Sequence, residues 1–461
     1  MITRLEATRY RCFERLAIDL SEFQIIVGAN GAGKTTLLDI PVLLGELLRA
    51  DNLANVFLVK SPDKPARASN FRQLIFAQRG DDFSFAVEAR LSEDIRQKLV
   101  EFWCGEGVTP WQKELRESRE RWPTHIRYEL HFNLVNEREL RVFSESLFLF
   151  PDSAPLDRSV IGSRGIYPPY HQDWHPILKR ESKGICAFKP EGKFSLEDKF
   201  RHEEGNSIIN LEHLFVKPDI LAMSMVKYQP DAFPAANWLY ELLTEQTVFL
   251  NPDWSKLRSA SPPGQEKTII PSALNLPWLA LDLKKQGMPA DASETEKAAY
   301  RHPDYTDWVA HVKTALPQVE DIDVREREDD HHAYFSIRYV GGYEVPSSGL
   351  SDGTLRILTL TLLPYLSKTP KLIAVEEPEN GIHPQAIMAV MQSLSSLYHS
   401  QVLVSSHSPI VLAGTRKEIL LCAQLSRSGG VEILSGDKHP HLQTWRGEIS
   451  LGTLFAAGVL G

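Results

Sequence analysis

The sequence predicts an α/β fold, in which a mixed sheet with flanking helices is interrupted by a large, mostly helical insertion with some strands. Three patterns carry this prediction. A glycine-rich loop at residues 28–35 joins a short apolar run to a helical pattern, a buried strand ends in two glutamates, and a β-branched strand ends in a histidine. Alternating strands and helices are typical of a parallel sheet that binds ligands at the carboxyl ends of its strands.

The three patterns lie near opposite ends of the chain, so two distant segments must supply the predicted sheet. We expect residues 1–91 and 331–461 to form the two lobes of one nucleotide-binding head and residues 92–330 to form an inserted domain. The chain has 461 residues, of which 43% are hydrophobic, which is enough for about two or three structural units.

Composition narrows the class of protein. The sequence has no apolar run long enough to span a membrane, and residues 1–6 lack the order of a signal peptide, so a cytoplasmic protein without membrane association is expected. The four cysteines are too scattered for a metal site or a disulfide framework. The net charge of −9 argues against a broad basic surface for nucleic acid, although a local patch stays open.

The glycine-rich loop fits the pattern G-x-x-x-x-G-K-[ST], whose backbone N–H groups bind nucleotide phosphates at a helix N-terminus. Lys34 is expected to reach the β- and γ-phosphates, and the Thr35 hydroxyl is expected to bind Mg²⁺. The cofactors implied are therefore ATP and Mg²⁺. The residues expected to surround the nucleotide here are Gly28, Asn30, Gly31, Ala32, Gly33, Lys34, Thr35 and Thr36.

Two strands are predicted before this loop, at residues 2–7 and 15–20, because apolar and polar residues alternate there. The turn between them contains Tyr10, Arg11 and Phe13. Arg11 is a candidate phosphate contact, and either ring is a candidate for stacking on the base. A solvated arginine and two packing aromatics remain equally compatible with the sequence.

The segment 92–330 has no phosphate-binding pattern of its own. Periodicity predicts strands at 71–76 and 83–91 before this segment. Within it and just after it, periodicity predicts strands at 125–135 and 139–150, helices at 94–103, 235–246, 274–285 and 304–316, and a hairpin at 322–328 and 333–340. Asp304 is expected to cap the last helix. The pairs His171/His175 and Asp321/Asp323 have metal-like spacing but lack further ligands, so a surface loop and an ordinary strand are favoured.

A second helix N-terminus follows the hairpin. Ser351 is a good N-cap for the apolar helical run at residues 355–366, and Gly353 leaves backbone N–H groups open to an anion.

Two strand ends then supply side chains for catalysis. A buried strand ends in Glu376 and Glu377, of which one can bind Mg²⁺ and the other can orient a water for attack on the γ-phosphate. The strand at residues 401–407 ends in His407, a candidate donor to the γ-phosphate for which a packing role stays open.

The motifs and their order resemble the ABC-type ATPase head of the SMC, RecF and OLD families. The motifs are the phosphate loop (Walker A), the Ser351 segment (signature), the glutamate strand (Walker B), the run Glu379-Asn380-Gly381-Ile382-His383-Pro384 and His407. The chain is most similar to stand-alone AAA-family ATPases of bacterial antiphage defence systems. The resemblance covers about residues 1–91 and 331–461, and extends weakly to residues 238–243.

The resemblance implies a role for each motif. Glu377 would be the catalytic carboxylate, Glu376 and Thr35 would hold Mg²⁺, and His407 would be the switch histidine. Ser351 and Gly353 would cap the γ-phosphate bound by a partner subunit. The loop with Asn380 and His383 would touch that partner, so a homodimer or higher homo-oligomer with ATP-bridged heads is expected.

Two departures from the family pattern matter. Many relatives have Asp where this chain has Glu376, so the metal contact is expected to move outward or to include a water, with slow turnover. The signature reads Leu350-Ser351-Asp352-Gly353-Thr354, with an acid where transporter subunits carry glycine, which points away from transport.

The leading functional hypothesis is an ATPase that controls a separately encoded effector, with a nuclease or a toxin as candidate classes, in antiphage defence. OLD enzymes resemble this head followed by a nuclease domain, and residues 408–461 are expected to be too few for one. The alternative is a RecF-like ATPase that acts directly on DNA or RNA in repair or genome maintenance.

Overall fold

The computed structural model describes residues 1–60, 65–104, 115, 117–154, 173–180, 184–192, 214–291, 293–426, 429–445, 447 and 449–460. The chain divides into two compact units. The first comprises Met1–Ser21, Ile40–Glu245 and Leu425–Ile433, and the second comprises Glu22–Asp39, Gln246–Gln424 and Leu434–Gly461.

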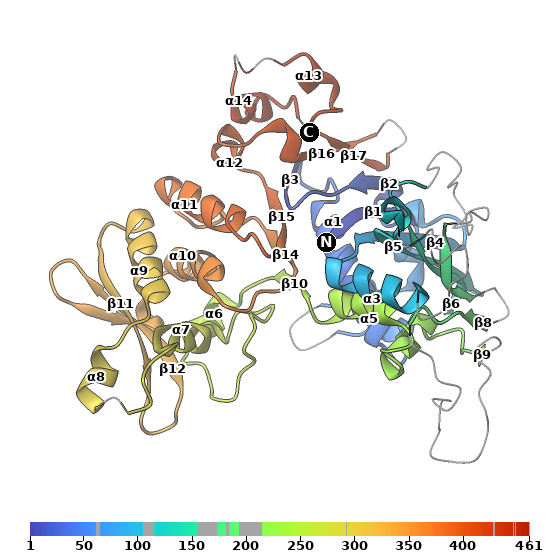
Figure 1. Cartoon of the computed structure of the whole chain (residues 1–461). Coiled ribbons are helices and arrows are strands. Elements are labelled where there is room, and N and C mark those ends of the chain that lie inside the picture. Colours follow the sequence, from blue (N-terminus) through green and yellow to red (C-terminus); the bar gives the residue numbers. More distant parts are fainter. Residues whose placement is uncertain are drawn as a thin grey trace. The chain divides into compact units, whose positions relative to one another are not determined.

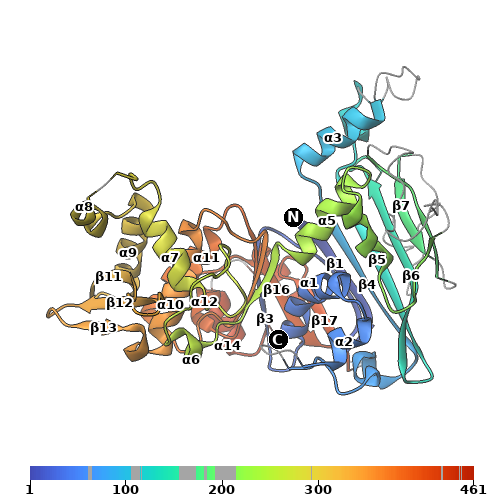
Figure 2. The same cartoon turned by 90° about the horizontal axis from the view of Figure 1, so that it is seen from below.

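The first unit is built on an antiparallel sheet of eight strands (Figures 1 and 2). The strands are β1 (Ile2–Tyr10), β2 (Phe13–Asp19), β4 (Asp82–Arg90), β5 (His125–Val135), β6 (Glu139–Phe150), β7 (His175–Arg180), β8 (Ile185–Phe188) and β9 (Leu214–Phe215). Their order is β2-β1-β4-β5-β6-β7-β8-β9. The predicted strands at 2–7, 15–20, 83–91, 125–135 and 139–150 are therefore confirmed.

Alternation along these strands gives the sheet two different faces. On one face, Leu5 pairs with Val87 and Ala7 pairs with Phe85, and all four are buried. On the other face, buried charged side chains lie opposite one another, with Arg127 of β5 beside Glu88 of β4.

Helices complete the first unit. They are α1 (Lys34–Arg49), which begins in the second unit, α2 (Leu53–Leu58), α3 (Glu93–Cys104) and α5 (Pro234–Thr244), with 3-10 turns η1 (Phe71–Leu74), η2 (Phe76–Gln78), η3 (Arg119–Arg121) and η5 (Ala222–Tyr228). Gly45 lets α1 approach α5 closely, since a Cβ at Gly45 would lie 2.0 Å from the Leu243 carbonyl oxygen.

The strand predicted at residues 71–76 is wrong, because these residues form η1 and the start of η2. The Asn70 side chain accepts a hydrogen bond from the Gln73 backbone N–H and so caps the first of these turns. Ala77 and Gln78 then have positive φ angles of 52° and 55°, which end any extended conformation.

The second unit contains a parallel sheet. Its strands are β3 (Phe23–Gly28), β10 (Thr247–Leu250), β14 (Leu372–Glu376), β15 (Gln401–Ser406) and β16 (Leu420–Leu425), which pair in the order β10-β14-β15-β3-β16. Nearly every residue of β14, β15 and β3 is buried, as expected for a sheet covered on both faces. The last strand of the chain is β17 (Val431–Ser435).

A smaller antiparallel sheet lies in the same unit, formed by β11 (Val319–Glu326), β12 (Ala333–Tyr339) and β13 (Glu344–Pro346). The hairpin predicted at 322–328 and 333–340 is confirmed by the β11–β12 pairing.

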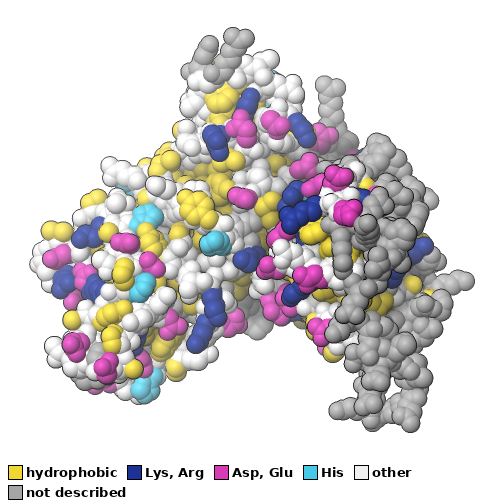
Figure 3. Space-filling model, in the orientation of Figure 1, with side chains coloured by type: hydrophobic (Ala, Val, Ile, Leu, Met, Phe, Trp, Pro, Cys, Tyr) yellow, Lys and Arg dark blue, Asp and Glu magenta, His cyan; other side chains and the backbone are white. Residues whose placement is uncertain are grey.

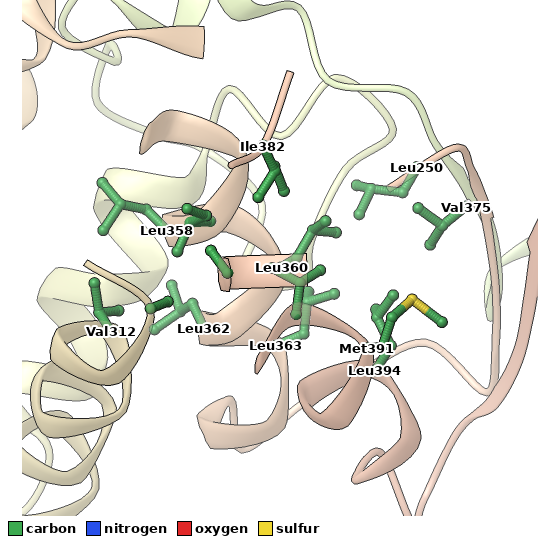
Figure 4. Packing of buried hydrophobic residues seen from close by; sticks show 14 of the residues in the cluster. Leu250, Val312, Leu358, Leu360, Leu362, Leu363, Val375, Ile382, Met391 and Leu394 are labelled. Carbon is green, nitrogen blue, oxygen red and sulfur yellow. The ribbon is translucent and has the colours of Figure 1, made fainter. Parts of the chain in front are cut away.

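The helices of the second unit are α6 (Trp254–Leu257), α7 (Leu276–Lys285), α8 (Glu294–Ala299), α9 (Pro303–Ala315), α10 (Asp352–Leu362), α11 (Pro384–Ser395), α12 (Pro409–Ala413), α13 (Pro440–Gln443) and α14 (Leu451–Ala456), with turns η6 (Ser347–Gly349), η7 (Leu363–Tyr365) and η8 (Lys417–Ile419). All of these helices except α8 share one apolar core with the strands of the unit. Figure 4 shows leucines of α10 facing Met391 and Leu394 of α11, with Leu250 and Val375 of the sheet nearby.

The predicted N-cap of α9 is wrong by two residues. His302 is the cap, and its Nδ1 accepts the Asp304 backbone N–H at 3.3 Å. Pro303 occupies the first helical position, which proline favours because its missing N–H would have no partner there.

The unit boundaries differ from the predicted boundaries at residues 91/92 and 330/331. β5 and β6 lie in one sheet with β1, while β10 pairs with β14. The segment 92–330 also holds strands β5 to β11 beside its helices, because its alternating runs complete sheets begun elsewhere in the chain. Among the described residues, no helix is long and apolar enough to cross a membrane.

Candidate functional site

The phosphate loop lies between β3 and α1, as the sequence predicts. Gly31 and Gly33 have φ angles of 80° and 75°, in the left-handed region that favours glycine. Gly28 is required for a second reason, since a Cβ there would lie 2.2 Å from the Ala423 carbonyl oxygen of β16. Asn30 is exposed, Ala32 is buried, and Thr36 lies in the first turn of α1. The backbone of the loop is therefore fixed by its sequence.

Lys34 closes this loop. Its Nζ donates to the carbonyl oxygens of Gly28 and Ala29, each at 2.9 Å, and only 6% of the residue is exposed. Burial lowers the pKa of Lys34, while the carboxylates of Glu377 and Glu376 oppose that shift. The ammonium group is thus held at the loop beside two carboxylates, with weak acceptors that a phosphate would replace.

Three adjacent parallel strands bring the catalytic candidates together. The strands β14, β15 and β3 lie next to one another (Figure 1), with Glu376 in register with Ser405 and Ser405 in register with Ile26. The carboxyl ends of these strands therefore meet at one edge, where Glu376 and Glu377 follow β14 and His407 follows β15.

Glu376 contacts the phosphate loop directly, because the Thr35 hydroxyl donates a hydrogen bond to its Oε1. A threonine hydroxyl and a carboxylate in contact are the hard oxygen donors that Mg²⁺ prefers, so this pair fits the metal that the motif implies. Among the described residues, no group of three or more His, Cys, Asp or Glu side chains could hold a metal ion.

Glu377 contacts His407 and Asn380. His407 Nε2 lies 3.0 Å from Glu377 Oε1, and the Asn380 amide donates to Glu377 Oε2. Glu377 has a positive φ of 44°, an unfavourable conformation for a side chain with a Cβ. Its backbone N–H donates to the Ser405 carbonyl at 3.0 Å, which fixes the turn against β15.

The signature residues begin α10. The Ser351 hydroxyl accepts the Thr354 backbone N–H at 3.1 Å, which confirms the predicted N-cap. Gly353 approaches the turn after β14 closely, since a Cβ there would lie 2.3 Å from the Gly381 carbonyl oxygen. Ser351 itself is exposed, and it shares no hydrogen bond with the phosphate loop among the described residues.

Two residues of this region were missed by sequence reasoning. Arg356 of α10 donates to the carbonyl oxygens of Glu377 and Asn380 and lies 4.6 Å from the Trp254 ring. Glu379 accepts hydrogen bonds from Ser406 and from the His407 backbone. Arg356 carries a signal, because it is the one charged side chain in an apolar helical run.

Arg11 belongs to the first unit, where its guanidinium donates to the Arg67 carbonyl oxygen. Tyr10 and Phe13 are at most 1% exposed, and Tyr10 packs edge-on against Phe85. The base-stacking role considered for these two aromatics is therefore wrong, since the rings serve the core.

The structure also shows the surroundings of the two residue pairs with metal-like spacing. Asp321 pairs with Arg301 and Arg338, and Asp323 pairs with Lys284 and Arg325, so these carboxylates form ordinary ion pairs on a strand. Burial lowers the pKa of His175 to about 4, and its ring lies 4.2 Å from that of Trp103. His171 lies outside the described residues.

Comparison with known proteins bears on the same region. Residues 287–413 match the family described as "AAA domain, putative AbiEii toxin, Type IV TA system", a range that holds the signature, β14 and β15. A comparison with curated proteins found no match.

Among solved structures, the chain is similar to an Smc head bound to the C-winged helix domain of ScpA (13% identity, TM-score 0.48, covering 94% of this chain and 97% of that chain). It is also similar to an Smc head with ScpA derived from Pyrococcus furiosus (14%, 0.44, 94% and 95%) and to the SMC head of Thermotoga maritima (10%, 0.39, 94% and 98%). At these low identities and TM-scores, we draw no inference from them.

The family match covers the half of the site that follows the hairpin, and the phosphate loop supplies the other half. Residues 287–413 are therefore similar to an AAA domain, and they hold the strand β14 whose Glu376 contacts Thr35 of the phosphate loop.

Proposed function

We propose that this protein binds and hydrolyses ATP with Mg²⁺, and that ATP joins two copies of the chain into a switch for a separately encoded effector. One observation supports the proposed hydrolysis of ATP. Lys34, the Thr35–Glu376 pair and the Glu377–His407 pair converge at the carboxyl edge of three adjacent parallel strands.

Each side chain then has a defined task. Lys34 exchanges its two carbonyl acceptors for phosphate oxygens when ATP binds. Glu377 takes the proton from the attacking water as a general base, and His407 holds the carboxylate through Oε1. Mg²⁺, held by Thr35 and Glu376, would neutralise charge that develops between the β- and γ-phosphates.

The switch requires a second chain. Ser351 is exposed, and its hydroxyl and the nearby N–H groups at the start of α10 form an anion site that its own phosphate loop does not use. ATP bound to one chain would complete its coordination with Ser351 and Gly353 of the partner subunit. Because ATP binds the closed pair more tightly than the separate chains, it shifts the equilibrium toward the dimer, and hydrolysis resets it.

The effector is inferred from the family. The description of the family that residues 287–413 match names a "putative AbiEii toxin" of a toxin–antitoxin system, and on this ground we favour a toxin over a nuclease as the effector. Direct action on nucleic acid has less support, because positive and negative side chains are interspersed on the visible face of the second unit (Figure 3) and the net charge is −9.

A mixing experiment tests the composite site. Lys34→Ala should lose ATP binding and Ser351→Arg should lose hydrolysis, so each variant alone is inactive. In a mixed dimer, one of the two sites combines an intact Lys34 with an intact Ser351, and part of the ATPase activity should return. No recovery of activity, although the chains demonstrably exchange, would contradict the composite site.

A second experiment separates effector control from direct action on nucleic acid. The native complex is purified and its companions are identified, and hydrolysis is assayed for stimulation by DNA.

A further inference from the structure

Glu379 lies in the turn between β14 and α11 and has no part in the chemistry proposed above. Its Oε1 accepts two hydrogen bonds, from Ser406 Oγ at 2.6 Å and from the His407 backbone N–H at 3.0 Å. Its Oε2 is buried and has no hydrogen-bond partner among the described residues. One oxygen of this carboxylate therefore makes both contacts to the segment after β15.

Ser406 strengthens this link. The residue is fully buried, and its hydroxyl accepts the Ser408 backbone N–H at 3.0 Å while it donates to Glu379. With both roles occupied, the hydroxyl cannot rotate away without breaking two hydrogen bonds at once. Glu379 thus fixes the main chain on both sides of His407.

The contacts close into a ring. From Glu379 the ring passes to the His407 backbone, through the imidazole to Glu377 Oε1 at 3.0 Å, and back along the chain through Pro378. The Glu377 N–H also donates to the Ser405 carbonyl at 3.0 Å. The hydrogen bonds that Glu379 accepts therefore lie in the same closed ring as the contact between the imidazole and the catalytic carboxylate.

We propose that Glu379 is a positioning residue, which sets the separation of His407 Nε2 and Glu377 Oε1 through its hydrogen bonds to Ser406 and to the His407 backbone. The kinetic consequence rests on the proposed ATP hydrolysis. Glu379 contacts Ser406 and the His407 backbone and not the phosphate loop, so its effect is expected to fall on turnover and not on nucleotide affinity.

Kinetics give the first test. Glu379→Ala should lower kcat by about 10²-fold, the scale that a misplacement of about 1 Å produces, while KM for ATP stays at the wild-type level. Glu379→Gln keeps an oxygen for the two donors and places its amide at the unpaired position, so it should restore most of the turnover. A Gln variant as impaired as the Ala variant, or an Ala variant with wild-type kcat, would overturn the proposal.

A double-mutant cycle separates positioning from general destabilisation. If Glu379 acts through His407, then adding Glu379→Ala to His407→Ala should cause no further loss of kcat. Losses that multiply would show that Glu379 acts by another route and would overturn the proposal.

Crystal structures of the two variants give a readout that does not depend on activity. The distance between His407 Nε2 and Glu377 Oε1 should lengthen beyond hydrogen-bond reach in Glu379→Ala and stay near its present value in Glu379→Gln. An unchanged distance in Glu379→Ala would overturn the proposal, even if the wild-type protein proved not to hydrolyse ATP and the proposed function failed. If Glu379→Ala does not fold, Ser406→Ala removes one of the two donors and is measured in the same ways.

Discussion

Carboxylates meet cations in both units, but at different places along their strands. In the first unit, Arg127 lies within β5 and pairs with Glu6, Glu88 and Glu129 at 2.8, 2.7 and 2.5 Å. In the second unit, Glu376 and Glu377 lie where β14 ends, and the side chain of Glu377 is 27% exposed.

The difference separates structural charges from functional ones. An arginine that is 1% exposed and has three carboxylate partners is shielded from any ligand, so we expect its pairs to act on stability. Charges at a strand end contact hydroxyl, amide and imidazole groups that can exchange for substrate. The residue types are the same, and their position along the strand and their exposure decide their use.

The largest expected effect lies in the first unit. Arg127→Ala removes the cation that three carboxylates share, of which Glu6 also pairs with Arg4, in a site where the arginine side chain is 1% exposed. It should lower the free energy of unfolding by about 3–5 kcal/mol. ATP turnover measured well below the melting temperature should be unchanged. Denaturant unfolding measures the stability of this variant and of a control variant, Arg90→Ala.

Arg90 lies in the same sheet but forms an exposed pair with Asp152, in which the side chains are 53% and 55% exposed. Its loss should cost less than about 1 kcal/mol. Equal destabilisation by the two substitutions would break the proposed distinction between buried and exposed charges.

The next largest effect is expected on ATP hydrolysis in the second unit. Glu377→Gln should slow hydrolysis by about 10²-fold or more, because it removes the general base, and should leave ATP and Mg²⁺ bound. The melting temperature should not fall. Single-turnover hydrolysis and ATP titration measure the two parts, and a larger loss of turnover in Glu376→Gln with binding intact would exchange the roles of the two glutamates.

A smaller effect is expected from Glu376→Asp. Glu376 already reaches the Thr35 hydroxyl, so the shorter side chain should withdraw from it and weaken Mg²⁺ binding by about tenfold. The Mg²⁺ dependence of ATP turnover measures this change. Tighter Mg²⁺ binding in the Asp variant would show that the glutamate holds the metal less directly than its present contact indicates.

The smallest effect is a pH dependence in the first unit. Glu191 accepts the Ala236 backbone N–H at 2.6 Å at the start of α5, and burial raises its pKa to about 8 from the ordinary value of 4.5. Between these values the folded chain holds a proton that the unfolded chain has released, so stability falls as pH rises through this window. Glu191→Gln should flatten the fall in melting temperature between pH 5 and pH 8, whereas the exposed Glu245→Gln should not.

Local patterns predicted most of the elements. The phosphate loop, the glutamates after β14, His407 and the Ser351 cap lie where spacing and periodicity place them, because each depends on a short stretch of chain. The partition of 92–330 between two sheets could not be predicted, since pairing of β10 with β14 depends on residues more than a hundred positions apart. Glu379 was missed for the same reason, because its partners follow a different strand.

The backbone conformation of Glu377 is unfavourable for stability, although its side chain is needed for the proposed chemistry. Its φ of 44° costs a residue with a Cβ about 1 kcal/mol or more, whereas glycine adopts this backbone without strain and asparagine with little. A library of variants at this position, selected for thermal tolerance alone, should be enriched in Gly and Asn and depleted of ATP turnover. Natural selection for activity and laboratory selection for robustness would therefore drive residue 377 in opposite directions.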